Sequence, residues 1–236
     1  MKNLHLFLYV FITVQIANAQ ELNGAWEKVD EKLEEQKTIK LFSDAYFTTS
    51  TYLESSGEFV SANGGTYTIN ESDYIENYEV NSQSKAVSGS FINFNYKIEN
   101  DTLHLSDKNS KNEEVWVKID EANDEMVNCW RIHEVFRDSK WVKIDDKPRK
   151  TLKMLTDNYY QVLALNSQTG EFFGSSGGKW QYEDGKHQEM IRFFSKNPKM
   201  TGDTLTFKME VENGIWKHNG KSSKGEYIQE RWKRYK

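Results

Sequence analysis

The chain has 236 residues, enough for one large domain or two ordinary ones, and its formal net charge at pH 7 is −5. Lys and Glu are interspersed along it, and this mildly acidic balance argues against nucleic acid as a partner. Cys129 is the only cysteine, which excludes an intramolecular disulfide. The core must therefore depend on apolar burial, for which seven Trp, twelve Tyr and thirteen Phe are available.

The first 19 residues are expected to be removed during export. Lys2 supplies a positive charge, residues 4–16 are mostly apolar, and Ala17-Asn18-Ala19 fits the small-residue rule for signal peptidase. The apolar run is shorter than the roughly 20 residues that a membrane-spanning helix needs. The sequence therefore predicts cleavage near Ala19-Gln20 and a secreted or periplasmic protein that is not an integral membrane protein.

One segment occurs twice at a constant offset of 113 residues. Lys37–Lys40 reads KTIK and Lys150–Lys153 reads KTLK, and each is followed by an Asp, a Tyr, the tripeptide GEF and a Gly pair. The match continues without a gap to Glu76 and Glu189. Its period is far longer than the 20 to 50 residues of solenoid repeats, so it predicts a duplicated domain.

Copy one is expected to consist of short strands joined by turns. Alternating apolar and polar residues, rich in Thr and Tyr, predict strands at about 25–29, 38–42, 46–53, 58–61, 66–70, 73–80, 91–98, 102–105 and 114–119. Asn63, Gly64 and Gly65 are interpreted as a hairpin turn, because Asn and Gly tolerate positive φ. No amphipathic helix is expected, and only two Pro residues are present to interrupt a sheet.

The acidic segment 120–127 is the expected boundary between the copies. It places the two units at 20–122 and 123–236, after a signal peptide at 1–19. Copy two begins at Trp130 and carries an insertion, Arg131–Arg149, before its KTLK motif.

The later part of copy two is expected to be shortened. After Glu189 it is interpreted as lacking the polar loop that occupies 81–89 in copy one. Gly202-Asp203-Thr204-Leu205 would then correspond to Asn100-Asp101-Thr102-Leu103.

An open sheet of eight strands would expose two edges that invite aggregation, and closing the sheet into a barrel removes both. Each copy, of about a hundred residues, has a suitable length for such a barrel. The predicted fold is all-β, with two tandem antiparallel up-and-down β-barrels. A single sandwich formed by both copies is the alternative.

The opening Asn23-Gly24-Ala25-Trp26 resembles the G-x-W start of the lipocalin and calycin barrels. The chain is also similar to bacterial secreted lipocalin-like proteins through its GEF…GG, D-T-L and E-x-W-x-K/R segments, over nearly all of both copies. The resemblance implies that Trp26 plugs one barrel end with Lys118 over it, and that Trp130 does so with Arg231 or Arg234. Copy two lacks the glycine, since it reads Asn128-Cys129-Trp130. The resemblance implies no reaction, because one fold hosts many functions.

The usual signatures of catalysis and cofactor binding are missing from the sequence. It has no G-x-S-x-G, phosphate-binding loop or CxxC motif, so no cofactor and no catalytic residue is predicted. A metal site would require residues distant in sequence to converge, because no two of the mature histidines lie at metal-ligand spacing: His104, His133, His187 and His218. His187 stands where copy one has Tyr74, and Cys129 is interpreted as a buried hydrophobe.

Positions that both copies share are the candidate ligand-binding residues: Tyr46, Tyr67, Glu76, Tyr159, Trp180 and Glu189. Aromatic rings with a polar edge suit the wall of a ligand cavity. The structural alternatives are core packing for the aromatic residues and a solvent-facing cross-strand pair for the carboxylates.

Three functions follow from these patterns. The first is an exported, non-catalytic protein that binds a small apolar or amphipathic, lipid-like ligand in one or both barrels. The second is an interaction module whose filled barrels present the loops 81–89 and Arg131–Arg149 to a protein or glycan. The third is a hydrolase or isomerase that uses Glu76 and Glu189 for acid–base chemistry.

Overall fold

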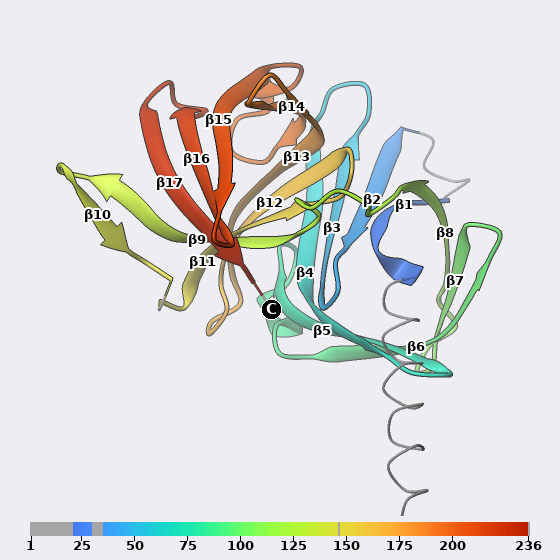
Figure 1. Cartoon of the computed structure of the whole chain (residues 1–236). Coiled ribbons are helices and arrows are strands. Elements are labelled where there is room, and N and C mark those ends of the chain that lie inside the picture. Colours follow the sequence, from blue (N-terminus) through green and yellow to red (C-terminus); the bar gives the residue numbers. More distant parts are fainter. Residues whose placement is uncertain (1–20, 30–34, 146, 236) are drawn as a thin grey trace, which may run out of the picture.

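The computed structural model describes residues 21–29, 35–145 and 147–235, and the predicted signal peptide lies outside them. The described residues form seventeen strands and two short 3-10 helices. Eight strands close into each of two antiparallel barrels, which lie side by side in Figure 1. The predicted fold class is confirmed, and the single sandwich is wrong. Among these residues, no helix is long and apolar enough to cross a bilayer.

Barrel 1 is closed by pairing between its first and last strands. A short helix, η1 (Lys85–Val87), lies between its fifth and sixth strands. The strands are β1 (Gly24–Lys28), β2 (Gln36–Phe42), β3 (Tyr46–Leu53), β4 (Phe59–Ile69), β5 (Asp73–Asn81), β6 (Phe91–Glu99), β7 (Thr102–Asp107) and β8 (Glu113–Asp120).

Barrel 2 is closed in the same way, by pairing between the first and last strands of its ring. Its strands are β9 (Asn128–Arg137), β11 (Arg149–Leu155), β12 (Tyr159–Asn166), β13 (Glu171–Glu183), β14 (Lys186–Phe194), β15 (Thr204–Glu212), β16 (Ile215–Lys221) and β17 (Tyr227–Arg234), with η2 (Pro198–Met200) after β14. The remaining strand, β10 (Lys140–Lys143), pairs with β9 outside the ring. The insertion of copy two therefore forms a hairpin that projects from barrel 2 on the side away from barrel 1 (Figure 1).

The hairpin expected at Asn63, Gly64 and Gly65 is wrong, because β4 runs unbroken through these residues. The glycines instead lie at a β-bulge against β5, between Gly64 and Gly65. A Cβ atom built on Gly65 would lie 1.9 Å from the carbonyl oxygen of Asn77, so no side chain fits there. Gly pairs mark close backbone approach as well as turns, and the bulge bends the strand around the barrel.

The prediction that the second half of copy two is shortened is also wrong. The strand β15 pairs with β14 and β16, just as β6 pairs with β5 and β7. Thr204 therefore corresponds to Phe91, and the 113-residue offset continues through the loop that contains η1 in one copy and η2 in the other. The short D-T-L match between the copies is local and does not mark equivalent strands.

Strand alternation divides each barrel wall into an inward and an outward face. Inward aromatic and aliphatic side chains fill one end of barrel 1 and include Trp26, Phe42, Phe47, Tyr67, Tyr74, Phe94 and Trp116. The corresponding end of barrel 2 is filled by Met126, Trp130, Leu155, Tyr160, Trp180, Trp216 and Trp232.

The outward faces of β2 and β3 pack against those of β11 and β12 in a core that both barrels share. Ile39 and Leu41 enter this core from one copy of the repeated motif, and Leu152 and Met154 enter it from the other. Leu163 reaches across as well, since a Cβ atom built on Gly64 would lie 2.9 Å from its Cδ2 atom. The two barrels therefore bury apolar surface that neither could bury alone.

The shared core predicts that Leu163→Ala destabilises both barrels. Truncation of a fully buried Leu costs about 2–5 kcal/mol, and the lost contacts here span both units. Native-state hydrogen exchange read by mass spectrometry should show faster exchange in peptides from both barrels. The control is Val211→Ala, whose side chain is 47% exposed and whose loss should change stability by less than about 0.5 kcal/mol. An effect confined to barrel 2 would contradict the shared core.

Candidate ligand cavities in the two barrels

Each barrel encloses one Lys–Glu ion pair at the same relative position. In barrel 1, Nζ of Lys40 donates a hydrogen bond of 2.5 Å to Oε1 of Glu76, and the two side chains are 4% and 2% exposed. In barrel 2, Lys153 donates to Glu189, and both side chains are 4% exposed. The alternative that placed these carboxylates in solvent is therefore wrong.

The repeated motif explains how the lysines come to lie inside. Its residues alternate along β2 and β11, so the apolar Ile39 and Leu41 face outward while Lys40 between them faces inward. The same alternation places Lys153 inside barrel 2. One four-residue motif thus supplies both the contact between barrels and the charge within each.

Other polar groups complete the environment of Glu76. Its Oε1 atom accepts a hydrogen bond of 2.6 Å from the hydroxyl of Tyr74, and its Oε2 atom accepts one of 2.5 Å from Tyr78. Burial is the main cause that raises the pKa of both tyrosines, and the negative charge of Glu76 is the second. Their hydroxyls therefore remain protonated and donate. The ammonium of Lys40 also lies 4.6 Å from the ring centroid of Trp116. A buried charge needs an opposite charge and hydrogen bonds such as these to offset its lost hydration.

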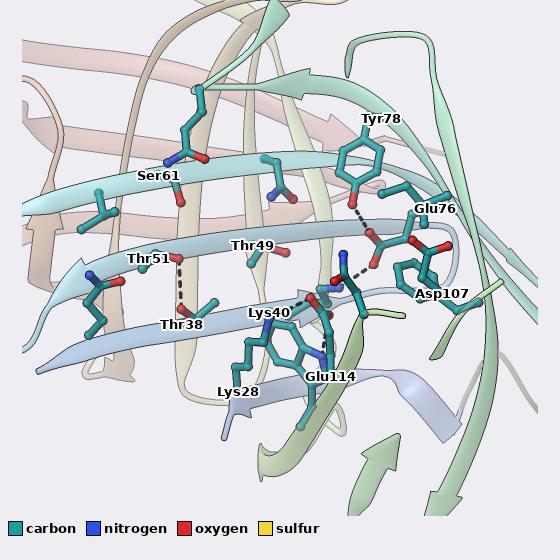
Figure 2. A pocket seen from close by; sticks show the side chains of 18 residues that line it. Lys28, Thr38, Lys40, Thr49, Thr51, Ser61, Glu76, Tyr78, Asp107 and Glu114 are labelled. Atoms are coloured by element: carbon teal, nitrogen blue, oxygen red, sulfur yellow. Dashed lines mark hydrogen bonds and ion pairs between the residues drawn. The ribbon is translucent and has the colours of Figure 1, made fainter. Parts of the chain in front are cut away.

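Barrel 1 contains a cavity of about 360 Å³ above this ion pair. Most of its lining is hydroxyl, amide or charged: Lys28, Gln36, Thr38, Lys40, Thr49, Thr51, Ser61, Asn63, Glu76, Tyr78, Gln83, Asp107, Asn112 and Glu114 (Figure 2). Val60, Ile92, Phe94 and Trp116 complete the lining. The cavity is therefore polar, whereas the opposite end of the same barrel is filled by aromatic residues.

A second ion pair lies in the wall of this cavity. Nζ of Lys28 is 2.8 Å from Oε1 of Glu114, and Nε1 of Trp116 donates to Oε2 of the same carboxylate at 3.0 Å. Burial tends to raise the pKa of Glu114, but the charges of Lys40 and Lys28 outweigh it and hold the pKa below its ordinary value. Two polar atoms at the cavity, Oγ1 of Thr49 and Oδ1 of Asn63, have no hydrogen-bond partner among the described residues.

The cavity of barrel 2 is smaller, about 210 Å³, and more apolar. Ile132, Val162, Ile191, Phe194, Leu205, Phe207, Ile228 and Trp232 line it together with Lys153, Glu189, His218 and Glu230. The ammonium of Lys153 lies 5.2 to 5.6 Å from three ring centroids, those of Phe207, Trp216 and Trp232. Cation–π attraction thus supplements the ion pair in this barrel.

The histidines of barrel 2 lie beside its ion pair. Nε2 of His187 is 2.9 Å from Oε1 of Glu189, and Nε2 of His218 is 3.9 Å from the same atom. Burial lowers the pKa of His187, and it lowers that of His218 to about 4. Burial would raise the pKa of Glu189, but Lys153 and the histidines lower it overall.

The structure separates the six predicted ligand-binding residues into three groups. Glu76 and Glu189 line the two cavities. Tyr46 lies in the core between the barrels, and Tyr159 packs against it. Tyr67 and Trp180 lie in the filled ends, where their polar atoms donate to backbone oxygens of Ser43 and Thr156 respectively, at 2.7 and 2.8 Å.

The predicted end-closing residues also lie together. Trp26 and Trp130 are buried, and each indole donates to a backbone oxygen four residues earlier. Nζ of Lys118 lies 5.9 Å from the ring centroid of Trp26, and Cζ of Arg234 lies 5.7 Å from that of Trp130. Arg231 instead packs on Trp141, at 3.9 Å from its ring centroid.

Sequence reasoning missed most of the cavity residues, including four charged ones: Lys28, Lys40, Glu114 and Lys153. Two of them stand in the repeated motif, so the repeat was the available signal. It was overlooked because a lysine in an alternating strand is usually interpreted as facing solvent.

The chain matches no family model and no curated protein sequence. Among solved structures, it is similar to the sliding clamp (DNA polymerase III subunit beta) of Pseudomonas aeruginosa, at 9% identity and a TM-score of 0.13, over 94% of this chain and 81% of that one. The DNA polymerase III beta chain of Streptococcus pneumoniae TIGR4 matches at 10% identity and a TM-score of 0.13, over 94% and 62%. Similarity at this level establishes neither the family nor the function of the chain. Membership of the lipocalin-like family therefore stays a prediction.

The buried pair in barrel 1 predicts strongly unequal effects of single and double substitutions. Lys40→Met leaves the charge of Glu76 buried without its cation, and we expect a loss of about 3–5 kcal/mol of unfolding free energy in urea titrations. Lys40→Met combined with Glu76→Gln should recover much of that loss, because neither position then carries a buried charge. Lys37→Met is the control from the same motif. Its exposed pair with Glu54 should contribute at most about 1 kcal/mol. Additive effects of the two inner substitutions would contradict the pairing.

The lowered pKa of Glu114 predicts a pH dependence of stability. A carboxyl whose pKa falls on folding stabilises the protein above its unfolded pKa, near 4.5, and loses that contribution as the pH falls through the lower folded value. The difference in unfolding free energy between the wild type and Glu114→Gln should therefore be constant above pH 4.5 and shrink below it. Glu113→Gln, at the exposed neighbouring position, is the control. A difference that grew on acidification would contradict the assignment.

Proposed function

We propose that the protein is an exported binding protein whose barrel 1 holds a small, neutral, polyhydroxylated molecule of the monosaccharide class. The observation that carries the proposal is the polar lining of a 360 Å³ cavity in that barrel (Figure 2). This volume lies within the usual range for small-molecule sites, about 300–1,000 Å³.

The pattern of side chains favours a ligand rich in hydroxyl groups. Thr38, Thr49, Thr51 and Ser61 present hydroxyls to the cavity, and Asn63 with three further amide side chains adds both donors and acceptors. Phe94 and Trp116 supply apolar ring surface at the same cavity. Groups of both kinds suit a molecule that has hydroxyl edges and C–H faces.

The charges of the cavity favour a neutral ligand. Lys40 is paired with Glu76, and Lys28 is paired with Glu114. Asp107 accepts a hydrogen bond of 2.6 Å from the hydroxyl of Ser110. A charged ligand would have to compete with these partners. The lining is also too polar for the lipid-like ligand that the sequence predicts, so we revise the ligand class while keeping the binding role.

The arrangement of the carboxylates favours binding over acid–base catalysis. Glu76 and Glu189 lie in different barrels and therefore do not form one acid–base pair. Both oxygens of Glu76 already accept hydrogen bonds from Lys40, Tyr74 and Tyr78.

The interaction module remains the second candidate. The hairpin of β9 and β10 favours it, because this segment projects from barrel 2 (Figure 1), and within the described part of the chain β10 pairs with β9 alone. If the protein still captured its partner after β10 was removed, that result would count against this role.

The binding proposal predicts that a monosaccharide titrated into the mature protein gives a saturable isothermal-calorimetry signal. Thr49→Val removes an unpartnered hydroxyl at the cavity with little change of shape, and should weaken binding about tenfold, as expected for one lost hydrogen bond. Thr48→Val is the matched control, because the neighbouring side chain faces the other way and lies against Gly64. Binding of only charged or apolar molecules, or equal effects of the two substitutions, would overturn the proposal.

A further inference from the structure

Barrel 2 brings together three side chains that commonly bind metal ions. His187 and Glu189 point inward from alternate positions of β14, and His218 points inward from β16. One ligand atom from each lies within 4.8 Å of the other two. All three residues are buried, with exposed fractions of 0%, 3% and 1%.

The spacing of the donor atoms suits a tetrahedral ion. Zinc binds His nitrogen and carboxylate oxygen at about 2.0–2.2 Å, which places neighbouring ligand atoms roughly 3.4 Å apart. The distances from Oε1 of Glu189 to Nε2 of His187 and His218, 2.9 and 3.9 Å, lie on either side of this value. Shifts of about half an ångström would bring both of these distances to that value.

A second observation also points to a ligand at this place. Among the described residues, His218 has no hydrogen-bond partner for either ring nitrogen, although its side chain is buried and lines the cavity. Its Nδ1 atom faces Oε2 of Glu230 at 3.5 Å, the position from which a carboxylate orients a metal-bound histidine. The 210 Å³ cavity beside Glu189 and His218 leaves room for a further ligand on the ion.

We propose that His187, Glu189 and His218 form a binding site for a divalent transition-metal ion, for which Zn²⁺ suits the two-histidine, one-carboxylate donor set. The inference goes beyond the ligand proposed for barrel 1 and does not depend on it.

Lys153 competes with the metal ion for Glu189 in this site. Its ammonium bonds to the same Glu189 oxygen that would hold the metal, so the ion can bind only when the ammonium moves away. Glu230 lines the same cavity and offers the ammonium a second carboxylate. The site should therefore bind metal more weakly than the same three ligands would without Lys153.

Barrel 1 provides an internal reference for the site. The offset of 113 residues places Tyr74 at the position of His187 and Leu105 at the position of His218, while Glu76 matches Glu189. The carboxylate and its lysine occur in both barrels, and the two histidines occur only in barrel 2. His187→Tyr and His218→Leu thus replace each ligand by a residue that the equivalent barrel already accommodates.

The test is calorimetric titration of the mature, metal-stripped protein with Zn²⁺, together with Co²⁺ absorption spectroscopy. We expect one ion per chain and a Co²⁺ spectrum typical of four-coordinate nitrogen and oxygen ligands. His187→Tyr and His218→Leu should each weaken binding at least about 100-fold, whereas His133→Gln, outside the cluster, should have little effect.

Lys153→Met is the decisive variant, because it removes the competitor and keeps all three ligands. We expect it to bind Zn²⁺ at least about tenfold more tightly than the wild type, and to show a larger rise in melting temperature when Zn²⁺ is added. Failure of both the wild type and Lys153→Met to bind would overturn the proposal. Equal binding by the wild type and both histidine variants would do so too, since the ion would then lie elsewhere.

Discussion

The feature on which the rest of the structure depends is the Lys–Glu pair enclosed in each barrel. A buried charge is tolerated only when a partner and further hydrogen bonds offset its lost hydration, so the residues around the pair are constrained together. In barrel 1 this requirement fixes the two tyrosine hydroxyls on Glu76 and the indole of Trp116 beside Lys40. The pair also divides the interior, since a packed aromatic end lies on one side of it and a polar cavity on the other.

The two barrels keep this pair and differ in what surrounds it. Barrel 1 places Tyr74 and Tyr78 on its glutamate, and hydroxyl and amide groups line a larger cavity. Barrel 2 replaces the first tyrosine by His187, adds His218, and has a smaller and more apolar cavity. The duplication thus preserves a scaffold, including the face that joins the copies, while the chemistry of each interior has diverged. This division supports separate roles for the two cavities.

The repeat and the strand alternation were sufficient to predict two closed antiparallel barrels, and the repeat singled out Glu76 and Glu189 as positions that both copies share. They could not reveal Lys40 and Lys153 as interior residues, because alternation alone does not say which face of a strand closes inward. Gly64 and Gly65 were misread as a turn, since glycine serves equally at a bulge where backbones approach closely. His218 was missed because a short D-T-L match placed its strand in the wrong register, and only the strand pairing aligns it with Leu105. Convergence of residues distant in sequence is a property of the closed barrel and leaves no local signal.

The most direct test of the account is NMR observation of the lysine side-chain amines in the mature, metal-free protein. The buried, ion-paired ammonium groups of Lys40 and Lys153 should each give an Nζ–H signal that exchanges slowly with water at neutral pH. Lys40→Met should remove one of them and Lys153→Met the other, while the exposed lysines exchange too fast to be seen. Fewer than two protected signals, or signals unaffected by these substitutions, would contradict the claim that both barrels are organised around an enclosed Lys–Glu pair.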